Sequence, residues 1–159
     1  MSRKQVYIET TIPSFYHEIR QEPEMIARRN WTRDWWDNCS QKYELVTSVA
    51  VIEELSSGNY PNQSKALNLI RNVRIAPVES EVIEIVDNYI FHKAMPKNPR
   101  GDALHVALAS YHKCDFLLIW NCQHLANANK FGHIRSVNTM LNLLTPIMAT
   151  PLELRGGGL

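Results

Sequence analysis

The chain has 159 residues and carries 17 basic and 16 acidic side chains, for a formal charge of +1. This length fits one domain with a substantial core and is short for two. The near-neutral charge gives no overall attraction to nucleic acid, so any contact with RNA has to come from local basic groups. We expect no membrane partner, because no apolar run is long enough to cross a bilayer and no signal peptide is evident.

The order of apolar runs and amphipathic stretches predicts an α/β fold with parallel strands and crossover helices. Short apolar runs bounded by polar residues indicate strands, and apolar residues three or four apart indicate helices. The expected strands cover residues 6–8, 45–48, 73–78, 116–120 and 146–148, and the expected helices cover 14–22, 24 onward, 49–55, 62–72, 79–94, 102 onward, 124–130 and 139–144.

Several of these elements carry more detailed predictions. The strand over 116–120 is apolar throughout, which predicts burial on both faces, and Pro146 favours an edge position for the last strand because proline lacks an N–H. Asn62 or Ser64 is expected to cap the helix that follows the break at 58–62. We expect residues 1–154 to form one domain and 155–159 a flexible tail.

The helix from residue 24 places Trp31 and Trp35 on one face, with Trp36 beside them. Core or dimer packing is the simpler interpretation of these side chains, and base stacking is the alternative. Arg28 and Arg29 lie off that face and suit either phosphate contacts or a solvated helix surface.

Acidic or amide side chains follow or flank the predicted strands at comparable places. Glu9 comes directly after the first strand, Glu54 lies in the helix after the second, Asp102 opens a helix, and Asn121 ends the strand over 116–120. Because ligands of parallel sheets collect at the carboxyl ends of the strands, we expect these four side chains to converge. Any one of them alone could equally cap a helix or interact with its dipole.

Gathered carboxylates repel one another unless something offsets their charge. Mg²⁺ or Mn²⁺ would do so, since these hard cations prefer oxygen ligands. Such a metal activates a bound water and neutralises charge in the transition state, so the pattern predicts hydrolysis of phosphoesters.

Four segments carry a resemblance to a known family: 6–14 (VYIETTIPS), 48–55 (SVAVIEEL) with Gly58, 102–109 (DALHVALA) and 117–127 (LLIWNCQHLAN). Together with 150–154 (TPLEL), they resemble PIN-domain proteins, the nuclease fold of VapC-type toxins, in order and spacing over residues 5–154. The resemblance implies a three-layer α/β/α domain around a mainly parallel, roughly five-stranded sheet. It also implies an acidic pocket with Mg²⁺ or Mn²⁺, an RNA substrate, an antitoxin partner and a homodimer.

By this resemblance, Glu9, Glu54 and Asp102 are the metal ligands, and Asn121 completes the catalytic set. Two positions depart from the commoner pattern of the family. Glu9 is one methylene longer than the usual Asp, and Asn121 replaces a carboxylate and so brings no charge. Three carboxylates could hold one metal, which leaves a second metal in question.

Further residues could support this site. Thr10 or Thr11 could donate to Glu9 or to a metal-bound water, or else cap the first helix. His105 follows Asp102 by three positions and His124 follows Asn121 by three, so both could orient carboxylates or contact the phosphate, or be purely structural. Ser48 has no paired base and is expected to be a turn or cap residue. Possible phosphate contacts near the pocket are Lys97 and Arg100.

A zinc site built from histidines and cysteines is an alternative, but the spacing of these residues fits no usual zinc pattern. The cysteines are odd in number and lack a paired spacing, which is typical of a reducing cytoplasm. The conceivable zinc ligands are His105, His112, Cys114, Cys122 and His124, and the three cysteines are Cys39, Cys114 and Cys122.

The leading hypothesis is a metal-dependent endoribonuclease, a VapC-like toxin in which water attacks an RNA phosphodiester. The alternative is a PIN-fold protein whose catalysis is impaired by the changes at Glu9 and Asn121 and which binds RNA or a protein partner. A phosphoacceptor signalling domain is a third hypothesis, and the lack of paired carboxylates after the first strand argues against it.

Overall fold

The structure is a computed structural model that describes residues 3–92, 100–120 and 128–155. The side chains at 100, 101 and 128–130 are not described. In chain order the elements are β1 (Gln5–Ile8), α1 (Thr11–Tyr16), α2 (Pro23–Asn38), the 3-10 turn η1 (Ser40–Lys42), β2 (Glu44–Ser48), α3 (Val49–Ser56), α4 (Gln63–Leu69), β3 (Arg74–Ala76), α5 (Ser80–Phe91), α6 (Arg100–Tyr111), β4 (Phe116–Leu118), α7 (Ala128–Met140) and β5 (Ile147–Ala149).

The five strands form one sheet in the order β3-β2-β1-β4-β5, and every neighbouring pair is parallel. β1 lies at the centre, where Tyr7 is in register with Val46 of β2 and Leu117 of β4. The parallel α/β prediction is therefore confirmed. β5 lies at one edge, as expected from Pro146.

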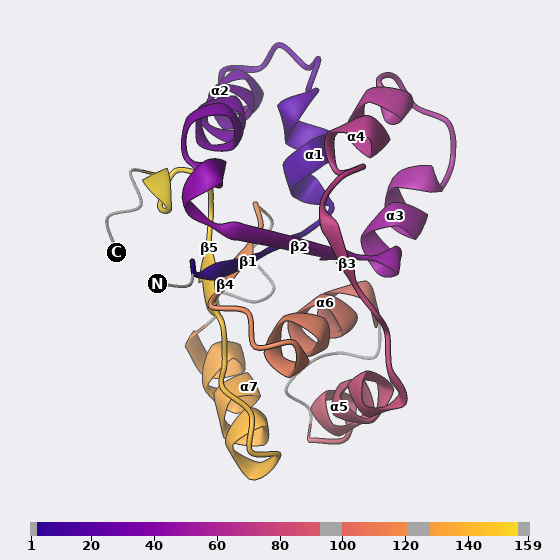
Figure 1. The fold of residues 1–159 in the computed structure, drawn as a ribbon, viewed down its shortest axis with the longest axis vertical. Coiled ribbons are helices and arrows are strands. Elements are labelled where there is room, and N and C mark those ends of the chain that lie inside the picture. The colour runs from indigo at the N-terminus through magenta and orange to yellow at the C-terminus, as the bar shows by residue number, and fades with distance from the viewer. Residues whose placement is uncertain (1–2, 93–99, 121–127, 156–159) are drawn as a thin grey trace.

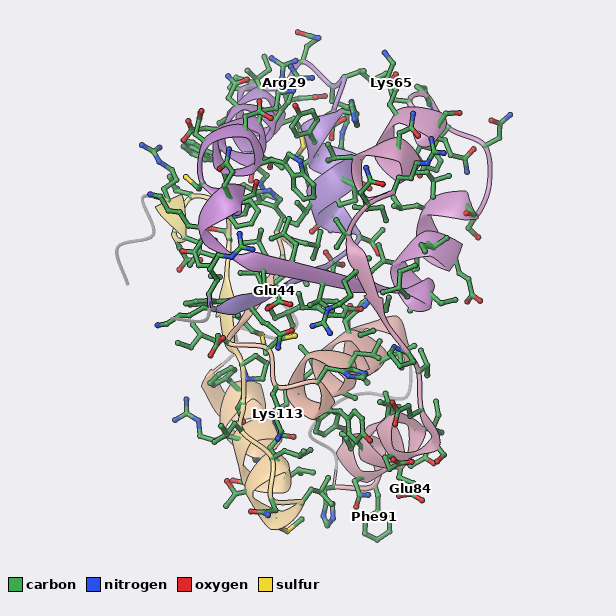
Figure 2. All side chains as sticks on the ribbon, viewed as in Figure 1. Arg29, Glu44, Lys65, Glu84, Phe91 and Lys113 are labelled. Carbon is green, nitrogen blue, oxygen red and sulfur yellow. The ribbon has the colours of Figure 1, made fainter. Side chains whose placement is uncertain are left out.

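Helices cover both faces of the sheet. Figure 1 shows α1, α2 and α4 on one side and α5, α6 and α7 on the other. Parallel strands need such crossovers, and their helices bury both faces of the sheet. The three-layer α/β/α arrangement is thus confirmed. Charged side chains such as Lys65 on α4 and Glu84 on α5 point outward from these layers (Figure 2).

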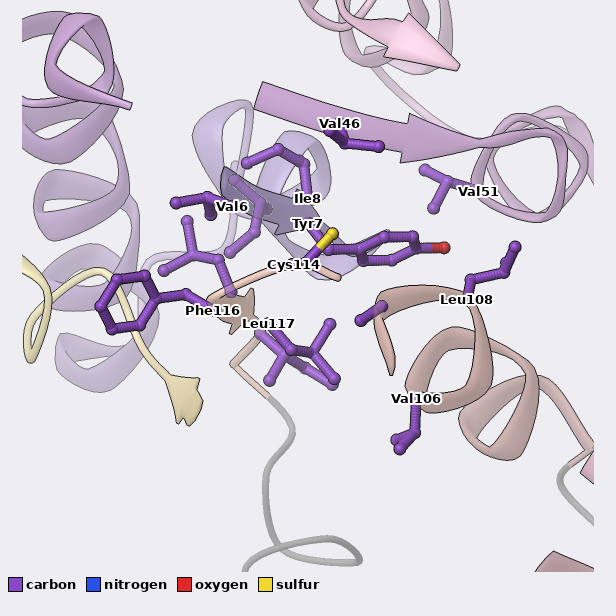
Figure 3. Close-up of a cluster of buried hydrophobic side chains, with 14 of the residues drawn as sticks. Val6, Tyr7, Ile8, Val46, Val51, Val106, Leu108, Cys114, Phe116 and Leu117 are labelled. Carbon is purple, nitrogen blue, oxygen red and sulfur yellow. The ribbon is translucent and has the colours of Figure 1, made fainter. Parts of the chain in front are cut away.

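The core lies between the central strands and the helices that flank them. Val6, Tyr7 and Ile8 of β1 are fully buried, and the three residues of β4 are buried on both faces, as predicted. Figure 3 shows Val51 of α3 and Leu108 of α6 beside Tyr7. The tyrosine is the one member of this central strand that brings a hydroxyl into the core, and that hydroxyl matters below.

The first helix is shorter than predicted. α1 ends at Tyr16 instead of continuing to residue 22. Glu18 explains the difference, because its Oε2 accepts hydrogen bonds from the backbone N–H groups of Ile19 and Arg20, at 3.0 and 3.2 Å. A side chain that bonds to the backbone just after it stabilises a turn in competition with a helix.

The end of the chain also differs. α7 runs through 134–137 and ends at Met140, where a separate helix over 139–144 was predicted. Asn142 adopts a left-handed conformation with φ 61°, and Leu143 N donates to Asn138 O at 2.7 Å. This is the geometry that closes a helix C-terminus, and asparagine tolerates it better than most residues.

Asn62 occupies the N-cap position of α4, but its side chain makes no capping bond. It adopts φ 65°, and its Nδ2 donates to His17 O at 3.1 Å, which fastens α4 to the end of α1. The capping prediction was therefore right in position and wrong in mechanism. α4 ends at Leu69, three residues before the predicted limit.

Trp35 lies in the core, as expected, and Trp31 and Trp36 are partly buried against it. Trp35 is fully buried, and Trp31 stacks on Trp120 with ring centroids 6.2 Å apart. Arg28 lies over Trp120 and Phe15, with its guanidinium carbon 5.4 and 5.6 Å from the ring centres. These cation–π contacts hold Arg28 against the aromatic cluster. Over the described ranges, no helix is long and apolar enough to span a membrane.

Candidate functional site

The structure brings four of the predicted site residues together at the carboxyl edge of the sheet. Glu9 directly follows β1, Thr10 is the N-cap of α1, Glu54 lies on α3, and His105 lies on α6. Glu9 N donates to Leu118 O of β4 at 3.2 Å, which places Glu9 where two central strands end. Three crossover helices therefore meet at this edge.

The remaining predicted residues are placed only in part. Asp102 lies in the first turn of α6, one helical turn before His105. Arg100 begins α6, and its side chain lies outside the described set. Lys97, Asn121 and His124 lie outside the described residues altogether.

Glu9 is buried, with 5% of its surface exposed, and faces into the protein. Its Oε1 accepts hydrogen bonds from Thr11 N at 2.7 Å and from Thr11 Oγ1 at 2.5 Å. The Thr11 hydroxyl in turn accepts from Trp120 N at 2.9 Å. One threonine thus joins the carboxylate after β1 to the backbone after β4. Of the two threonines that were predicted to donate to Glu9, Thr11 makes this hydrogen bond.

Glu54 is half-exposed, with 44% of its side-chain surface accessible. Its Oε1 accepts a hydrogen bond from Thr10 Oγ1 at 3.1 Å and is also hydrogen-bonded to His105 Nε2. The two carboxylates are therefore held by neighbouring threonines, Thr10 for Glu54 and Thr11 for Glu9. This arrangement leaves Glu54 open to solvent beside a buried Glu9.

His105 is buried and is hydrogen-bonded at both ring nitrogens. Nε2 meets Glu54, and Nδ1 lies 2.7 Å from the hydroxyl of Tyr7. The Tyr7 hydroxyl is also 2.7 Å from Ser48 Oγ, which accepts from Val51 N at 3.4 Å and so caps α3, as expected for Ser48. Figure 3 shows the Tyr7 hydroxyl directed toward α3 and α6.

Tyr7 was missed because it lies within the apolar run that predicts β1, where a tyrosine usually adds only packing. Its hydroxyl is significant because of tertiary contacts with residues 41 and 98 positions away. The local signal was a tyrosine hydroxyl at a position predicted to be buried, since such a hydroxyl usually has a hydrogen-bond partner.

The two carboxylates differ electrostatically. Burial raises the pKa of Glu9, and the nearby charge of Glu54 adds to that effect, against the opposing influence of His105 and Thr11. Partial burial also favours a higher pKa for Glu54, but hydrogen bonds from His105 and Thr10 outweigh it and leave the pKa below its ordinary value. Burial keeps the Tyr7 phenol neutral by raising its pKa. Ionised Glu54 thus faces a Glu9 that is costly to ionise.

The oxygen atoms at this site are of the type that hard divalent cations prefer as ligands. Glu9 and Glu54 offer carboxylate oxygens, and a cation would offset both the burial of Glu9 and its repulsion from Glu54. Within the described residues, the hydrogen bonds of both carboxylates engage Oε1. The same residues contain no group of three or more His, Cys, Asp or Glu side chains already arranged around a metal position, for zinc or for magnesium.

The five-stranded parallel sheet between helical layers, in the order β3-β2-β1-β4-β5, is consistent with a PIN-like fold. The chain aligns with a solved structure, VapBC2 from Rickettsia felis bound to a DNA fragment from their promoter, over 92% of this chain and 98% of the other. The TM-score is 0.59 and the sequence identity is 12%, so the likeness establishes a shared fold. No family model and no curated protein matches the sequence.

Proposed function

We propose that this protein is a metal-dependent endoribonuclease, a VapC-like toxin of a toxin–antitoxin pair. The observation that carries the proposal is the meeting of Glu9 and Glu54 at the carboxyl edge of a PIN-like sheet, where adjacent threonines hold the two carboxylates and His105 also holds Glu54. Burial and mutual repulsion both oppose the gathering of two ionised carboxylates, and a bound cation would offset both effects.

Glu9, Glu54 and Asp102 would hold Mg²⁺ or Mn²⁺, and Asn121 would orient a ligand or water. When bound, the cation supplies an activated water and neutralises charge on the phosphodiester. The protein's own contribution is placement, since Thr10 and His105 fix the open carboxylate and Thr11 fixes the buried one. Lys97 and Arg100 are the proposed phosphate contacts just before or at the start of the Asp102 helix.

The proposed partners are an RNA substrate, an antitoxin protein and a second copy of the chain. Support for the antitoxin comes from the similar solved structure, which is of VapBC2. The near-neutral charge is compatible with RNA binding only through local basic groups.

A second candidate is a PIN-fold protein that binds RNA or a protein without cleaving it. The specific observation in its favour is that Oε1 of both carboxylates is already engaged by protein donors, and the described residues do not form a ready three-ligand group. In this case Glu9 and Asn121 mark lost catalysis.

The test is cleavage of a mixed single-stranded RNA pool by the purified protein with Mn²⁺, Mg²⁺ or EDTA, beside Asp102→Ala. The proposal predicts cleavage that needs metal and disappears in a folded Asp102→Ala variant. Cleavage that persists in EDTA would contradict it. RNA binding that persists in EDTA without cleavage would support the second candidate instead.

A further inference from the structure

A chain of buried hydrogen bonds connects Ser48, the N-cap of α3, with Glu54 on the same helix. It passes from Ser48 Oγ to the Tyr7 hydroxyl, then to His105 Nδ1, and from His105 Nε2 to Glu54 Oε1. Ser48 and Tyr7 are fully buried and His105 is 1% exposed, so each of these polar groups depends on its protein partners.

The available protons give this chain one direction. Ser48 Oγ accepts from Val51 N, so its own hydrogen is available to the Tyr7 oxygen. The Tyr7 hydrogen then goes to His105 Nδ1, which is an acceptor in an imidazole that carries its proton on Nε2. That Nε2–H points at a carboxylate, and every donor in the chain is used once.

The other neutral tautomer leaves ring and carboxylate groups unmatched. With the imidazole proton on Nδ1, the bare Nε2 would face the Glu54 carboxylate, and two acceptors would meet. An unmatched buried polar group is costly, so the first arrangement is favoured.

We propose that Tyr7 and His105 are positioning residues that fix the tautomer and orientation of the imidazole and thereby the placement of Glu54. A glutamate that is half-exposed has free rotamers to lose, and a ring held at both nitrogens restricts them. The chain also ties α6, which carries Asp102, to α3 and β1. The expected effect on catalysis rests on the function proposed above, whereas the tautomer of the His105 imidazole does not.

The first readout is the tautomer of His105, measured by ¹⁵N NMR at about pH 8, above the ordinary imidazole pKa. The wild-type ring should carry its proton on Nε2. Tyr7→Phe removes the donor to Nδ1 and should shift the Nδ1 resonance. The matched control is Tyr89→Phe, which also loses a buried phenol hydroxyl, 2.6 Å from Asn138 Oδ1 and in a separate network, and should leave the His105 resonances unchanged.

The second readout is RNA cleavage with Mn²⁺. Tyr7→Phe should lower kcat about tenfold with little change in KM, because the free energy of one hydrogen bond corresponds to a rate change of about that size. Tyr89→Phe should keep the wild-type kcat. A wild-type ring protonated on Nδ1, or a Tyr7→Phe variant with ring resonances and kcat like those of Tyr89→Phe, would overturn the proposal. If the wild type cleaves no RNA, the proposed function fails, and the ¹⁵N NMR measurement of His105 still tests the positioning proposal. If Tyr7→Phe does not fold, the wild-type tautomer decides alone.

Discussion

His105 on α6 and Glu54 on α3 are hydrogen-bonded to each other although 51 positions separate them in the chain. This contact joins two crossover helices at the carboxyl edge of the sheet, where Glu9 also lies. Because one partner is buried and the other half-exposed, the contact connects the core to the surface of the site.

His105→Ala should destabilise the fold by about 2–4 kcal/mol, because it opens a cavity and leaves the buried Tyr7 hydroxyl without one of its partners. Urea unfolding measures the loss. His133→Ala removes an exposed histidine from α7 and should change the free energy of unfolding by less than about 0.5 kcal/mol. Equal effects of the two substitutions would show that the His105 contacts contribute nothing to stability.

Glu9→Gln should stabilise the protein at neutral pH when EDTA is present. Burial raises the pKa of Glu9, so the folded protein binds this proton more tightly than the unfolded chain does. Wild-type stability relative to the variant therefore falls as pH rises through the ordinary carboxyl pKa, and the two converge at about pH 3, where both states are protonated. Thermal unfolding across this pH range tests the sign, and a less stable Glu9→Gln at neutral pH would refute it.

The adjacent threonines provide a matched pair. Thr11→Val removes the hydroxyl donor to buried Glu9, keeps the backbone donor, and leaves Trp120 N without its acceptor, so it should cost about 1–3 kcal/mol. Thr10→Val removes only a hydrogen bond to half-exposed Glu54 and should cost less than about 1 kcal/mol. Chemical denaturation of both variants measures the difference, and the reverse order would contradict the described bonding.

Asn142 tests the end of α7. At φ 61° a glycine is unstrained and an alanine is not, so Asn142→Ala should be less stable than Asn142→Gly by about 1 kcal/mol. Denaturation midpoints of the two variants give the comparison. An alanine variant as stable as the glycine variant would mean that the helix does not end in this conformation.

The sequence was informative where local patterns decide structure. The apolar run before Glu9 and the Ser48 cap before α3 identified two strand ends, and parallel topology then brings such ends to one edge. Local patterns did not reveal Tyr7 as a partner of His105, because that contact depends on β1 lying between β2 and β4 and on how α6 packs. They also misjudged α1, where the Glu18 side chain favours a turn over a longer helix.

The most direct test of the proposed metal-dependent site compares two neighbouring glutamates on α3. Glu54→Gln removes the charge from the carboxylate held by His105 and Thr10, and Glu53→Gln makes the same change one residue earlier at an exposed position. We expect Mn²⁺-dependent RNA cleavage to fall by about 100-fold or more in Glu54→Gln and to stay at the wild-type rate in Glu53→Gln. Equal rates in the two folded variants would contradict the assignment of Glu54 to the site.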